Sequence, residues 1–306
     1  MKIIQDTTAF VSRTIRGTVS FGCRAVNKTF EVTRTCFNAV FPKNPVTKSR
    51  QFRIIPTSVE NSIGENAYDE LCPKNKNVES VTVIEVGNRL VKHCDRKELN
   101  FEFRVLESDE VNAFCLPGGK ICITIGLINK LKKEDKDVTV DDHDFSDLTY
   151  EDKLAAVLGH EITHACAAHG AMKMQMRMIL FAVSSIIKLA LGIFIYRKVE
   201  NDEAEKTNKA AQELFDMLWG AGRTVATCKH GHSHEYQSDR IGMKYAEKAG
   251  YDSIAGIWVQ QMFMNNFGSK KDSIALFSSH PPSQRRVEEC IRIYKKIQSE
   301  GANSID

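Results

Sequence analysis

Apolar residues recur at helical spacing in three stretches of the chain. Residues 58–72 and 78–94 each predict a helix, and Ser58 is expected to be the N-cap of the first. Residues 154–169 show the same period. Thr149-Tyr-Glu-Asp152 precedes them in the form of a capping box, with Asp in place of the usual Glu or Gln. The hydrophobic pattern therefore predicts a mainly helical chain.

Two stretches between these helices alternate as β-strands do. Residues 101–106 predict one strand, and residues 112–127 contain two strand-like runs on either side of Pro117-Gly118-Gly119, which predicts a hairpin. We therefore expect a small antiparallel sheet and an α+β fold. The hairpin is either plain core sheet, or its strand Ile121–Ile125 is an edge that holds an extended peptide by main-chain hydrogen bonds.

A long apolar run at residues 178–196 interrupts a polar part of the chain. Its 19 residues contain one charge, Lys188, and are long enough to cross a bilayer. A charge near the centre of a bilayer costs about 3 kcal/mol, which argues against a true span. We expect residues 172–200 to form an insert that covers the active site or lies in a membrane interface.

Composition and charge separate an N-terminal segment from the rest of the chain. Of the 306 residues, 42% are hydrophobic and 26% charged, as in an ordinary globular protein. Residues 1–50 hold nine Lys or Arg and two acidic residues, while the net charge of the whole chain is only +3. The basic balance thus belongs to residues 1–50, and nothing in the folded part, expected over residues 51–300, indicates a nucleic-acid partner.

The same segment, residues 1–50, has no apolar stretch of the kind that a secretory signal needs. It is rich in Arg, Ser and Thr and poor in acids, which resembles a mitochondrial transit peptide. The alternative is a basic arm that touches a membrane surface. The chain's nine cysteines form no CxxC pair. They are expected to be reduced thiols and not zinc ligands, which fits a reducing compartment better than secretion.

The helical run 154–169 carries the strongest chemical pattern, His160-Glu161-Ile162-Thr163-His164. Residues four apart on a helix lie about 40° apart around its axis, so His160 and His164 can aim two imidazoles at one point. Glu161 stands beside them as a general base, as in zinc peptidases. The alternative is a structural helix with exposed histidines.

A catalytic zinc site needs a third protein ligand. His169 is a poor candidate, because nine residues on a straight helix place it about 180° from His160. Residues 233–250 predict another helix, with Glu235 and Asp239 on one face. Glu235 suits a carboxylate ligand, and Asp239 could accept the second N–H of a ligand histidine. Otherwise this helix has an ordinary charged surface.

A third segment, Ser278–Glu288, contains His280 before two prolines and Arg286 at the start of a predicted helix. Proline restricts the residue before it to extended backbone. From such a position, His280 could donate to the oxyanion of a tetrahedral intermediate. Arg286 could pair with a carboxylate near the metal.

Taken in order, the HExxH helix, Glu235-Tyr-Gln-Ser-Asp239 and Ser279-His-Pro-Pro-Ser-Gln-Arg-Arg286 resemble the HtpX- and CAAX-prenyl-protease-like zinc endopeptidases. The stretch Asn112–Lys120 is similar to the branch with the Oma-type mitochondrial inner-membrane protease and its bacterial periplasmic relatives. The resemblance covers roughly residues 55–298. It departs from the family at Ser238, where Ala is usual, and in the lack of a clear N-terminal transmembrane helix.

The resemblance implies a zincin-like metallopeptidase domain whose sheet edge flanks the HExxH helix, with one Zn²⁺ per chain. It implies three metal ligands: His160, His164 and Glu235. It implies Glu161 as general base, His280 as transition-state stabiliser, and Asp239 behind the ligands; Arg286 is placed there by its own position in the chain. The hairpin adds candidate substrate-binding residues: Gly119, Ile121, Ile123 and Ile125.

Family members cleave misfolded or regulatory membrane-associated proteins. The resemblance therefore implies protein or peptide substrates, contact with a membrane or membrane proteins, and a place in or at the mitochondrial inner membrane. A homo-oligomer is a further expectation. The alternative is a catalytically silent or latent membrane-associated adaptor of the same fold.

Overall fold

The computed structural model describes residues 34–35, 37–73, 77–133, 138–140, 143–198, 231–266 and 280–305, with the backbone alone for residues 188–198. The chain divides into two compact units, one of Met1–Asn44 with Lys48–Ile54 and one of Pro45–Thr47 with Ile55–Asp306. In the first unit, Lys43 and Arg50 form an antiparallel bridge. Most of the predicted targeting segment lies outside the described residues. The elements below belong to the second unit.

The first two predicted helices are confirmed as α2 (Thr57–Leu71) and α3 (Val81–Val91). The prediction of Ser58 as N-cap is wrong, because α2 already begins after Pro56. Proline suits the start of a helix, since its fixed φ matches and its missing N–H costs no helical hydrogen bond. In α3, the Ser80 side chain accepts from the backbone N–H of Val83.

The sheet has four strands: β1 (Asn77–Val78), β2 (Glu102–Leu106), β3 (Ala113–Leu116) and β4 (Lys120–Thr124). The predicted hairpin is confirmed, since β3 and β4 pair antiparallel around the 3₁₀ turn η2 (Pro117–Gly119). β2 pairs with β4 in parallel, and β1 pairs with β2 antiparallel. The sheet is therefore mixed, and not antiparallel throughout as predicted.

The prediction that Ile121–Ile125 forms a sheet edge is wrong. The strand order is β1-β2-β4-β3, so β4 is hydrogen-bonded on both sides and its main chain cannot take up a peptide. Ile121 and Ile123 lie in the core, and Ile125 begins helix α4 (Ile125–Lys132). A strand buried on both faces has a nearly continuous apolar run, and in β4 this run is Ile121-Cys122-Ile123. The edge beside the HExxH helix is β3, which contacts that helix.

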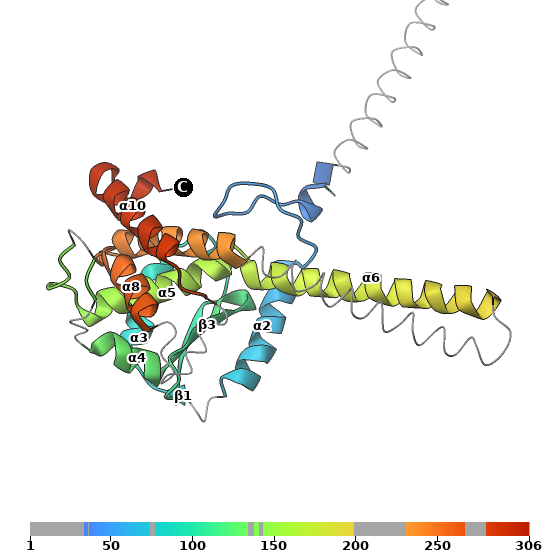
Figure 1. Cartoon of the computed structure of the whole chain (residues 1–306), viewed down its shortest axis with the longest axis horizontal. Helices are drawn as coiled ribbons and strands as arrows, with labels where there is room; N and C mark the ends of the chain where they lie inside the picture. Colours follow the sequence, from blue (N-terminus) through green and yellow to red (C-terminus); the bar gives the residue numbers. More distant parts are fainter. Residues whose placement is uncertain are drawn as a thin grey trace, which may run out of the picture. The chain divides into compact units, whose positions relative to one another are not determined.

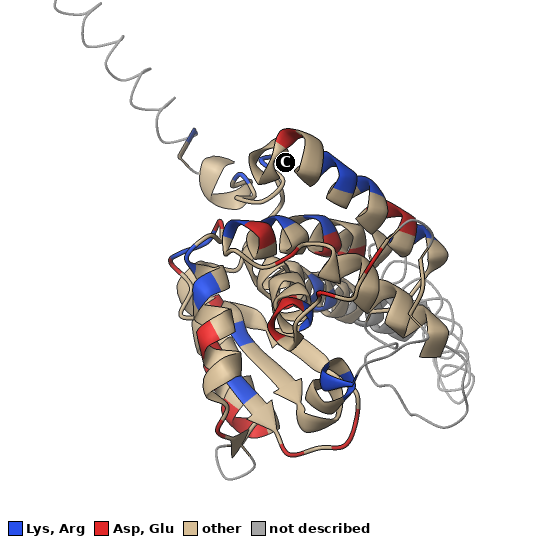
Figure 2. Ribbon diagram, turned by 90° about the vertical axis from the view of Figure 1, so that its left-hand side faces the viewer, with Lys and Arg blue, Asp and Glu red and all other residues tan. Residues whose placement is uncertain are grey.

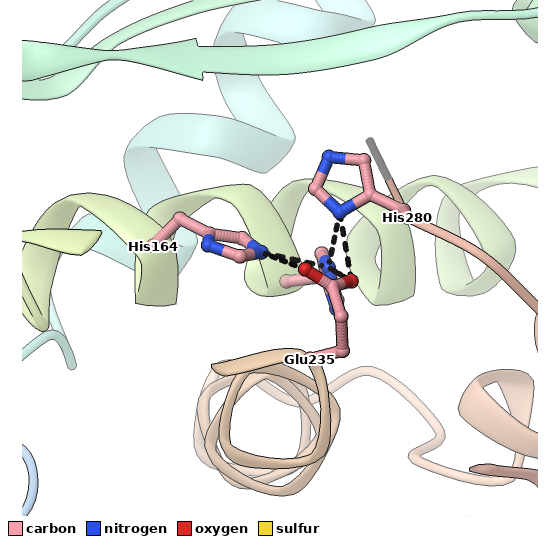
Figure 3. A group of neighbouring side chains, drawn as sticks. His164, Glu235 and His280 are labelled. Atoms are coloured by element: carbon pink, nitrogen blue, oxygen red, sulfur yellow. Dashed lines mark hydrogen bonds and ion pairs between the residues drawn. The ribbon is translucent and has the colours of Figure 1, made fainter. Parts of the chain in front are cut away.

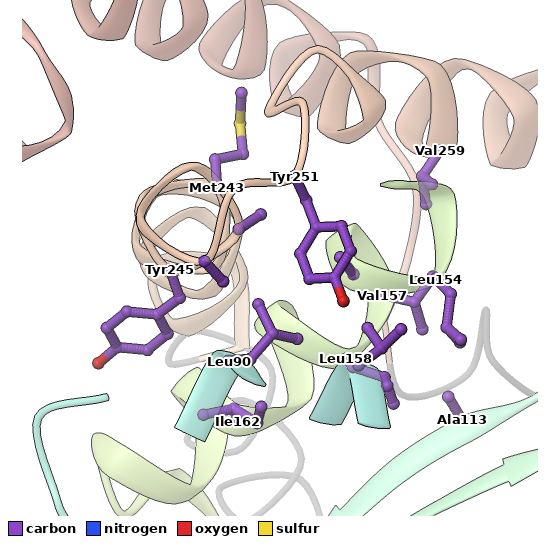
Figure 4. Packing of buried hydrophobic residues seen from close by; sticks show 14 of the residues in the cluster. Leu90, Ala113, Leu154, Val157, Leu158, Ile162, Met243, Tyr245, Tyr251 and Val259 are labelled. Atoms are coloured by element: carbon purple, nitrogen blue, oxygen red, sulfur yellow. The ribbon is translucent and has the colours of Figure 1, made fainter. Parts of the chain in front are cut away.

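Helix α5 (Tyr150–Cys166) carries the HExxH motif, and its predicted capping box is confirmed. The Thr149 side chain accepts from the N–H of Asp152, and the Asp152 carboxylate accepts from the N–H of Thr149. Leu154, Leu158 and Ile162 lie four residues apart and pack into the core (Figure 4). Because neighbours cover α5 on several sides, it is buried along most of its length.

α3, β3 and α8 (Ala255–Asn266) are among the elements that pack on α5, and α8 packs in turn on α10 (Gln284–Glu300) (Figure 1). Residues 231–248 are helical, in agreement with the helix predicted from residue 233. The short 3₁₀ turn η3 (Ala302–Ser304) follows α10. Figure 2 shows positively and negatively charged residues interspersed along the helices that face the viewer.

Arg96 ties α2 to the C-terminal end of α5. Its guanidinium lies 2.9 and 3.2 Å from the two carboxylate oxygens of Glu60 and donates to the carbonyl of Ala165 at 3.1 Å. Arg96 and Glu60 are each 1% exposed, so this ion pair is buried. A positive charge at this end of a helix also interacts favourably with the helix dipole.

The cysteine prediction is wrong for one pair, because Cys72 and Cys122 form a disulfide. The bond joins the end of α2 to β4, and the two residues pack with Tyr68 in a small apolar cluster. Nothing in the local sequence marks this pair, which is 50 residues apart. Cys94, Cys115, Cys166 and Cys290 are free thiols, as expected.

Helix α6 (His169–Lys198) contains most of the predicted insert, residues 172–200. Its segment His169–Ile187 is long and apolar enough to cross a membrane, by length and composition alone. The first turns are partly buried, but apolar side chains further along are exposed: Met176 by 41%, Phe181 by 73% and Ile186 by 65%. Whether this helix covers the site or lies in a membrane stays a prediction.

Candidate metal centre

The two helices that carry the candidate ligands approach each other through glycines. A Cβ on Gly159 would lie 2.8 Å from the carbonyl oxygen of Gly242, and a Cβ on Gly242 would lie 2.7 Å from the backbone nitrogen of His160. Real Cβ atoms do not come so close to backbone. The crossing therefore requires glycine at both positions, and it brings Glu235 and Asp239 beside His160.

Four side chains place one donor atom each within 4.8 Å of one another: His160, His164, Glu235 and His280. The Nε2 atoms of His160 and His164 are 3.0 Å apart. Glu235 faces both, with Oε2 3.2 Å from His160 and Oε1 3.4 Å from His164 (Figure 3). His160 and His164 on α5 thus form a zinc-like site with Glu235 from the neighbouring helix.

The donor set fits zinc, which binds imidazole nitrogen and carboxylate oxygen, mostly with four ligands in a tetrahedron. Glu235 is 1% exposed, and its Oε1 atom accepts no hydrogen bond even though Nε2 of His164 lies 3.4 Å away. A buried carboxylate oxygen without a partner is unfavourable unless a cation faces it. The burial and the convergence of these atoms therefore support a metal site.

The local charges also favour a cation. Burial lowers the pKa of His160, but hydrogen bonds to Asp239 and Glu235 outweigh it and raise this pKa to about 10. Burial raises the pKa of Glu235, but the neighbouring His164 and His280 hold it well below its usual range. The pKa of His164 is lowered, chiefly by burial. The negative charge that stabilises a protonated, buried histidine also stabilises a metal cation that replaces the proton.

Asp239 supports His160 from behind. Its Oδ1 atom is 2.8 Å from Nδ1 of His160, which orients the Nε2 atom toward the donor cluster. Arg286 donates to Asp239 through Nε and Nη2, both at 2.7 Å, and Gln260 donates to the same carboxylate at 3.0 Å. Burial raises the pKa of Asp239, but Arg286 outweighs it and keeps this pKa below its ordinary value. Gln260 lies on α8 and has no signal in the sequence.

Glu161 lines a cavity of about 150 Å³ together with His164 and His280 of the donor cluster. Phe114, Cys115 and Leu116 of β3 line the same cavity, so the sheet edge and the candidate base face one space. Glu161 is 2% exposed, and its Oε2 atom has no hydrogen-bond partner. This geometry leaves one oxygen of Glu161 available to a water or a peptide group.

His280 belongs to the donor cluster itself, which is closer to the other ligands than a donor to the oxyanion needs to be. Its Nδ1 atom is 2.8 Å from Oε2 of Glu235 (Figure 3). Its Nε2 atom is 3.7 Å from Oε1 of Glu161. The residue can therefore serve as a fourth ligand as well as a donor to a reacting group.

The prediction that His169 points away from the site is wrong. α5 ends at Cys166, Ala168 has a φ of 57°, and α6 begins at His169, so the helix is not straight through this region. The turn brings His169 back toward the site, where its Nδ1 atom is 2.9 Å from Nδ1 of His164. A left-handed alanine gives no warning in a sequence, because the conformation usually belongs to glycine.

The candidate substrate residues lie outside the donor cluster. Gly119 is in the η2 turn with a φ of 83°, a conformation that favours glycine. The carbonyl of Ile121 accepts from the hydroxyl of Tyr68. The structure thus gives Gly119 a conformational role and Ile121, Ile123 and Ile125 packing roles.

A sequence model described as peptidase family M48 matches residues 78–293 of this chain. The chain is 24% identical to the mitochondrial metalloendopeptidase OMA1 of Schizosaccharomyces pombe over 80% of its own length and 64% of the relative's. It is 28% identical to the mitochondrial metalloendopeptidase OMA1 of Bos taurus and 25% identical to the beta-barrel assembly-enhancing protease of Escherichia coli K12. Each of these two matches covers 64% of this chain and 33% of the relative.

The chain thus spans about two thirds of the fission yeast relative and one third of the other two. The matched residues 78–293 include the HExxH helix, Glu235 and His280, which are the parts that converge in the structure. The match covers more than half of the sequence, and the chain belongs to peptidase family M48.

Proposed function

We propose that this chain is a zinc-dependent endopeptidase that takes part in mitochondrial protein quality control. One observation carries the proposal: His160, His164 and Glu235 converge beside Glu161, at a cavity bordered by a sheet edge. The family match and the relatives named as metalloendopeptidases support the same activity.

In this proposal His160, His164 and Glu235 hold one Zn²⁺ per chain. Zinc bound by such ligands lowers the pKa of a water toward 7 and polarises the carbonyl to be cleaved. Glu161 takes a proton from the attacking water and delivers it to the leaving amide nitrogen. Asp239 and Arg286 keep His160 oriented toward the metal throughout.

The substrate is proposed to bind as an extended segment along β3, and not along β4 as the sequence suggests. β3 is at the sheet edge, contacts α5, and shares its cavity with Glu161. A peptide paired with this edge would form main-chain hydrogen bonds and lie beside the candidate base. Side-chain contacts would then determine which peptide sequences are cleaved, while β3 would align the peptide backbone.

The substrates are proposed to be misfolded or regulatory membrane-associated proteins, in or at the mitochondrial inner membrane. The word mitochondrial in the name of the fission yeast relative supports the organelle, and the name beta-barrel assembly-enhancing protease together with the exposed apolar residues of α6 supports contact with membrane proteins. A fusion of residues 1–50 to a reporter tests the proposed location, and we expect the reporter to be imported into mitochondria. Proteomic fragments that vanish when Glu161 is replaced would identify the substrates.

The decisive experiment replaces Glu161 with Gln in the full chain and measures zinc content and casein cleavage, with and without chelator. We expect zinc to remain and cleavage to fall by about 10²- to 10⁴-fold, as for the loss of a general base. Glu151→Gln is the matched control, because Glu151 is exposed in the first turn of the same helix. A Glu161→Gln protein that binds zinc and cleaves at the normal rate would refute the proposal.

A latent form is the second candidate, and the position of His280 favours it. Catalytic zinc sites keep one place for water, whereas four protein ligands close the site. His280 as fourth ligand would hold the enzyme inactive until it moves. His280→Ala separates the two roles: activity rises if His280 closes the site and falls if His280 donates to the oxyanion.

A further inference from the structure

His164 uses its two ring nitrogens in different surroundings. Its Nε2 atom faces Glu235 and His160 in the donor cluster. Its Nδ1 atom is 2.9 Å from Nδ1 of His169, which is only 1% exposed. Two imidazole nitrogens at this distance form a hydrogen bond only if one carries a proton and the other a lone pair.

The far side of His169 decides which nitrogen carries the proton. Its Nε2 atom is 2.9 Å from Oε1 of Gln237, on the helix that also holds Glu235. An amide oxygen only accepts, so Nε2 of His169 is the donor and Nδ1 of a neutral His169 has the lone pair. His164 must then donate through Nδ1–H, which leaves its Nε2 lone pair on the side of Glu235.

The opposite arrangement is incompatible with a metal. If Gln237 were turned so that its amide group donated, His169 would donate to Nδ1 of His164. The proton of His164 would then lie on Nε2, which could no longer bind a cation. Only one tautomer pattern along this chain of hydrogen bonds suits a ligand histidine, and it is the one with the Gln237 oxygen toward His169.

The backbone is held in an unusual conformation to make this contact. The φ of Ala168 is 57°, a left-handed conformation that residues other than glycine seldom adopt. His169 also stacks on His234, with ring centroids 3.9 Å apart and planes 11° from parallel. Packing could explain the stacked ring, but it does not explain the two hydrogen bonds of 2.9 Å that join Gln237 to His164 through His169.

The geometry points to His169 and Gln237 as positioning residues that hold His164 in the Nδ1–H tautomer and so set its affinity for the metal. The inference rests on the proposed zinc site. It gives the two ligand histidines different supports: His160 has a carboxylate paired with an arginine, whereas His164 has a neutral relay of imidazole and amide.

Zinc affinity tests the relay without any measurement of activity. The dissociation constant for Zn²⁺ is measured on the full chain by competition with a chromophoric chelator. Gln237→Leu keeps the size of the side chain and removes the acceptor, whereas Gln237→Glu keeps an acceptor. Because outer partners of ligand histidines contribute 10- to 100-fold in metal affinity, we expect Leu to weaken binding by about that factor and Glu to preserve it.

The two Gln237 variants distinguish a positioning role from a packing role. Gln237 is half-buried, so a role in packing alone would favour the apolar Leu over the charged Glu. His169→Phe and His169→Asn repeat the comparison at His169. Phe has no acceptor and is expected to weaken zinc binding, whereas Asn supplies an acceptor and is expected to restore it. If His169→Phe does not fold by circular dichroism, the Gln237 pair decides alone.

Two results would overturn the inference: Gln237→Leu binds zinc as the wild type does, or Gln237→Glu weakens binding as much as Gln237→Leu. Both are read against a wild-type chain that binds zinc. A wild-type chain that binds no zinc under the same conditions would instead refute the proposed function, and with it the relay.

Discussion

Helices α5 and α6 follow one another, are both rich in apolar residues, and have opposite surroundings. α5 is buried from Lys153 to Cys166 with little interruption, whereas α6 exposes large apolar side chains from Met176 onward. The left-handed turn at Ala168 separates them. Apolar content therefore does not decide which helix enters the core.

The two helices differ in the number of contacts that fix them in place. α5 has a capping box at one end, Arg96 at the other, and a glycine crossing with the helix 231–248 between them. α6 is held through its first turns, where Ala171 and Gln175 are buried. The helix that carries the candidate ligands is fixed at several points, while the described side chains of α6 beyond its first turns leave apolar surface that could meet a membrane or a partner.

Removal of Arg96 is expected to cause the largest loss of stability. Arg96→Met leaves the buried carboxylate of Glu60 without its partner, which costs about 3–5 kcal/mol. Urea unfolding monitored by circular dichroism measures this change. The double variant with Glu60→Met removes both charges and should regain much of the loss, and equal instability in single and double variants would contradict the assignment.

The glycine crossing should respond next. Gly242→Ala places a Cβ 2.7 Å from the backbone of His160, and the required shift of the helices should cost about 1–3 kcal/mol. Zinc affinity should fall as well, because Glu235 moves relative to the histidines. Gly231→Ala is the control in the same helix, since its Cβ would have no atom within 4 Å. The same effect from both variants would mean that the crossing is not the cause.

The capping box is expected to contribute less. Thr149→Ala removes the acceptor for the N–H of Asp152 and should lower the free energy of unfolding by about 1 kcal/mol. Thr149→Ser keeps the hydroxyl and should recover most of it. Equal stability of the alanine variant and the wild type would show that tertiary contacts alone fix the start of α5.

The exposed part of α6 should matter least for stability. Phe181→Ala, at 73% exposure, is expected to change the free energy of unfolding by no more than about 0.5 kcal/mol. Leu158→Ala in α5 should cost about 2–5 kcal/mol, because Leu158 is fully buried.

A double variant that adds Ile186→Ala tests the role of α6. If this helix contacts lipid, Phe181→Ala combined with Ile186→Ala should weaken binding of the chain to phospholipid vesicles. Unchanged vesicle binding, or a loss of stability as large as that of Leu158→Ala, would remove the contrast between the two helices.

Much of the candidate site follows from the sequence, because its parts lie within single elements. The spacing of His160 and His164, that of Glu235 and Asp239, and the box of Thr149 and Asp152 each depend only on the helical repeat. The hairpin likewise follows from two alternating runs around Pro117–Gly119. Local geometry is enough to predict such features.

The tertiary structure alone decided how these parts meet. It placed β4 inside the sheet by parallel pairing with β2, joined Cys72 to Cys122, set Gln260 against Asp239, and returned His169 to His164. These contacts join residues from separate elements, or depend on a left-handed alanine. The repeat within a helix or strand sets which residues share a face, but which faces meet depends on the packing of the whole chain.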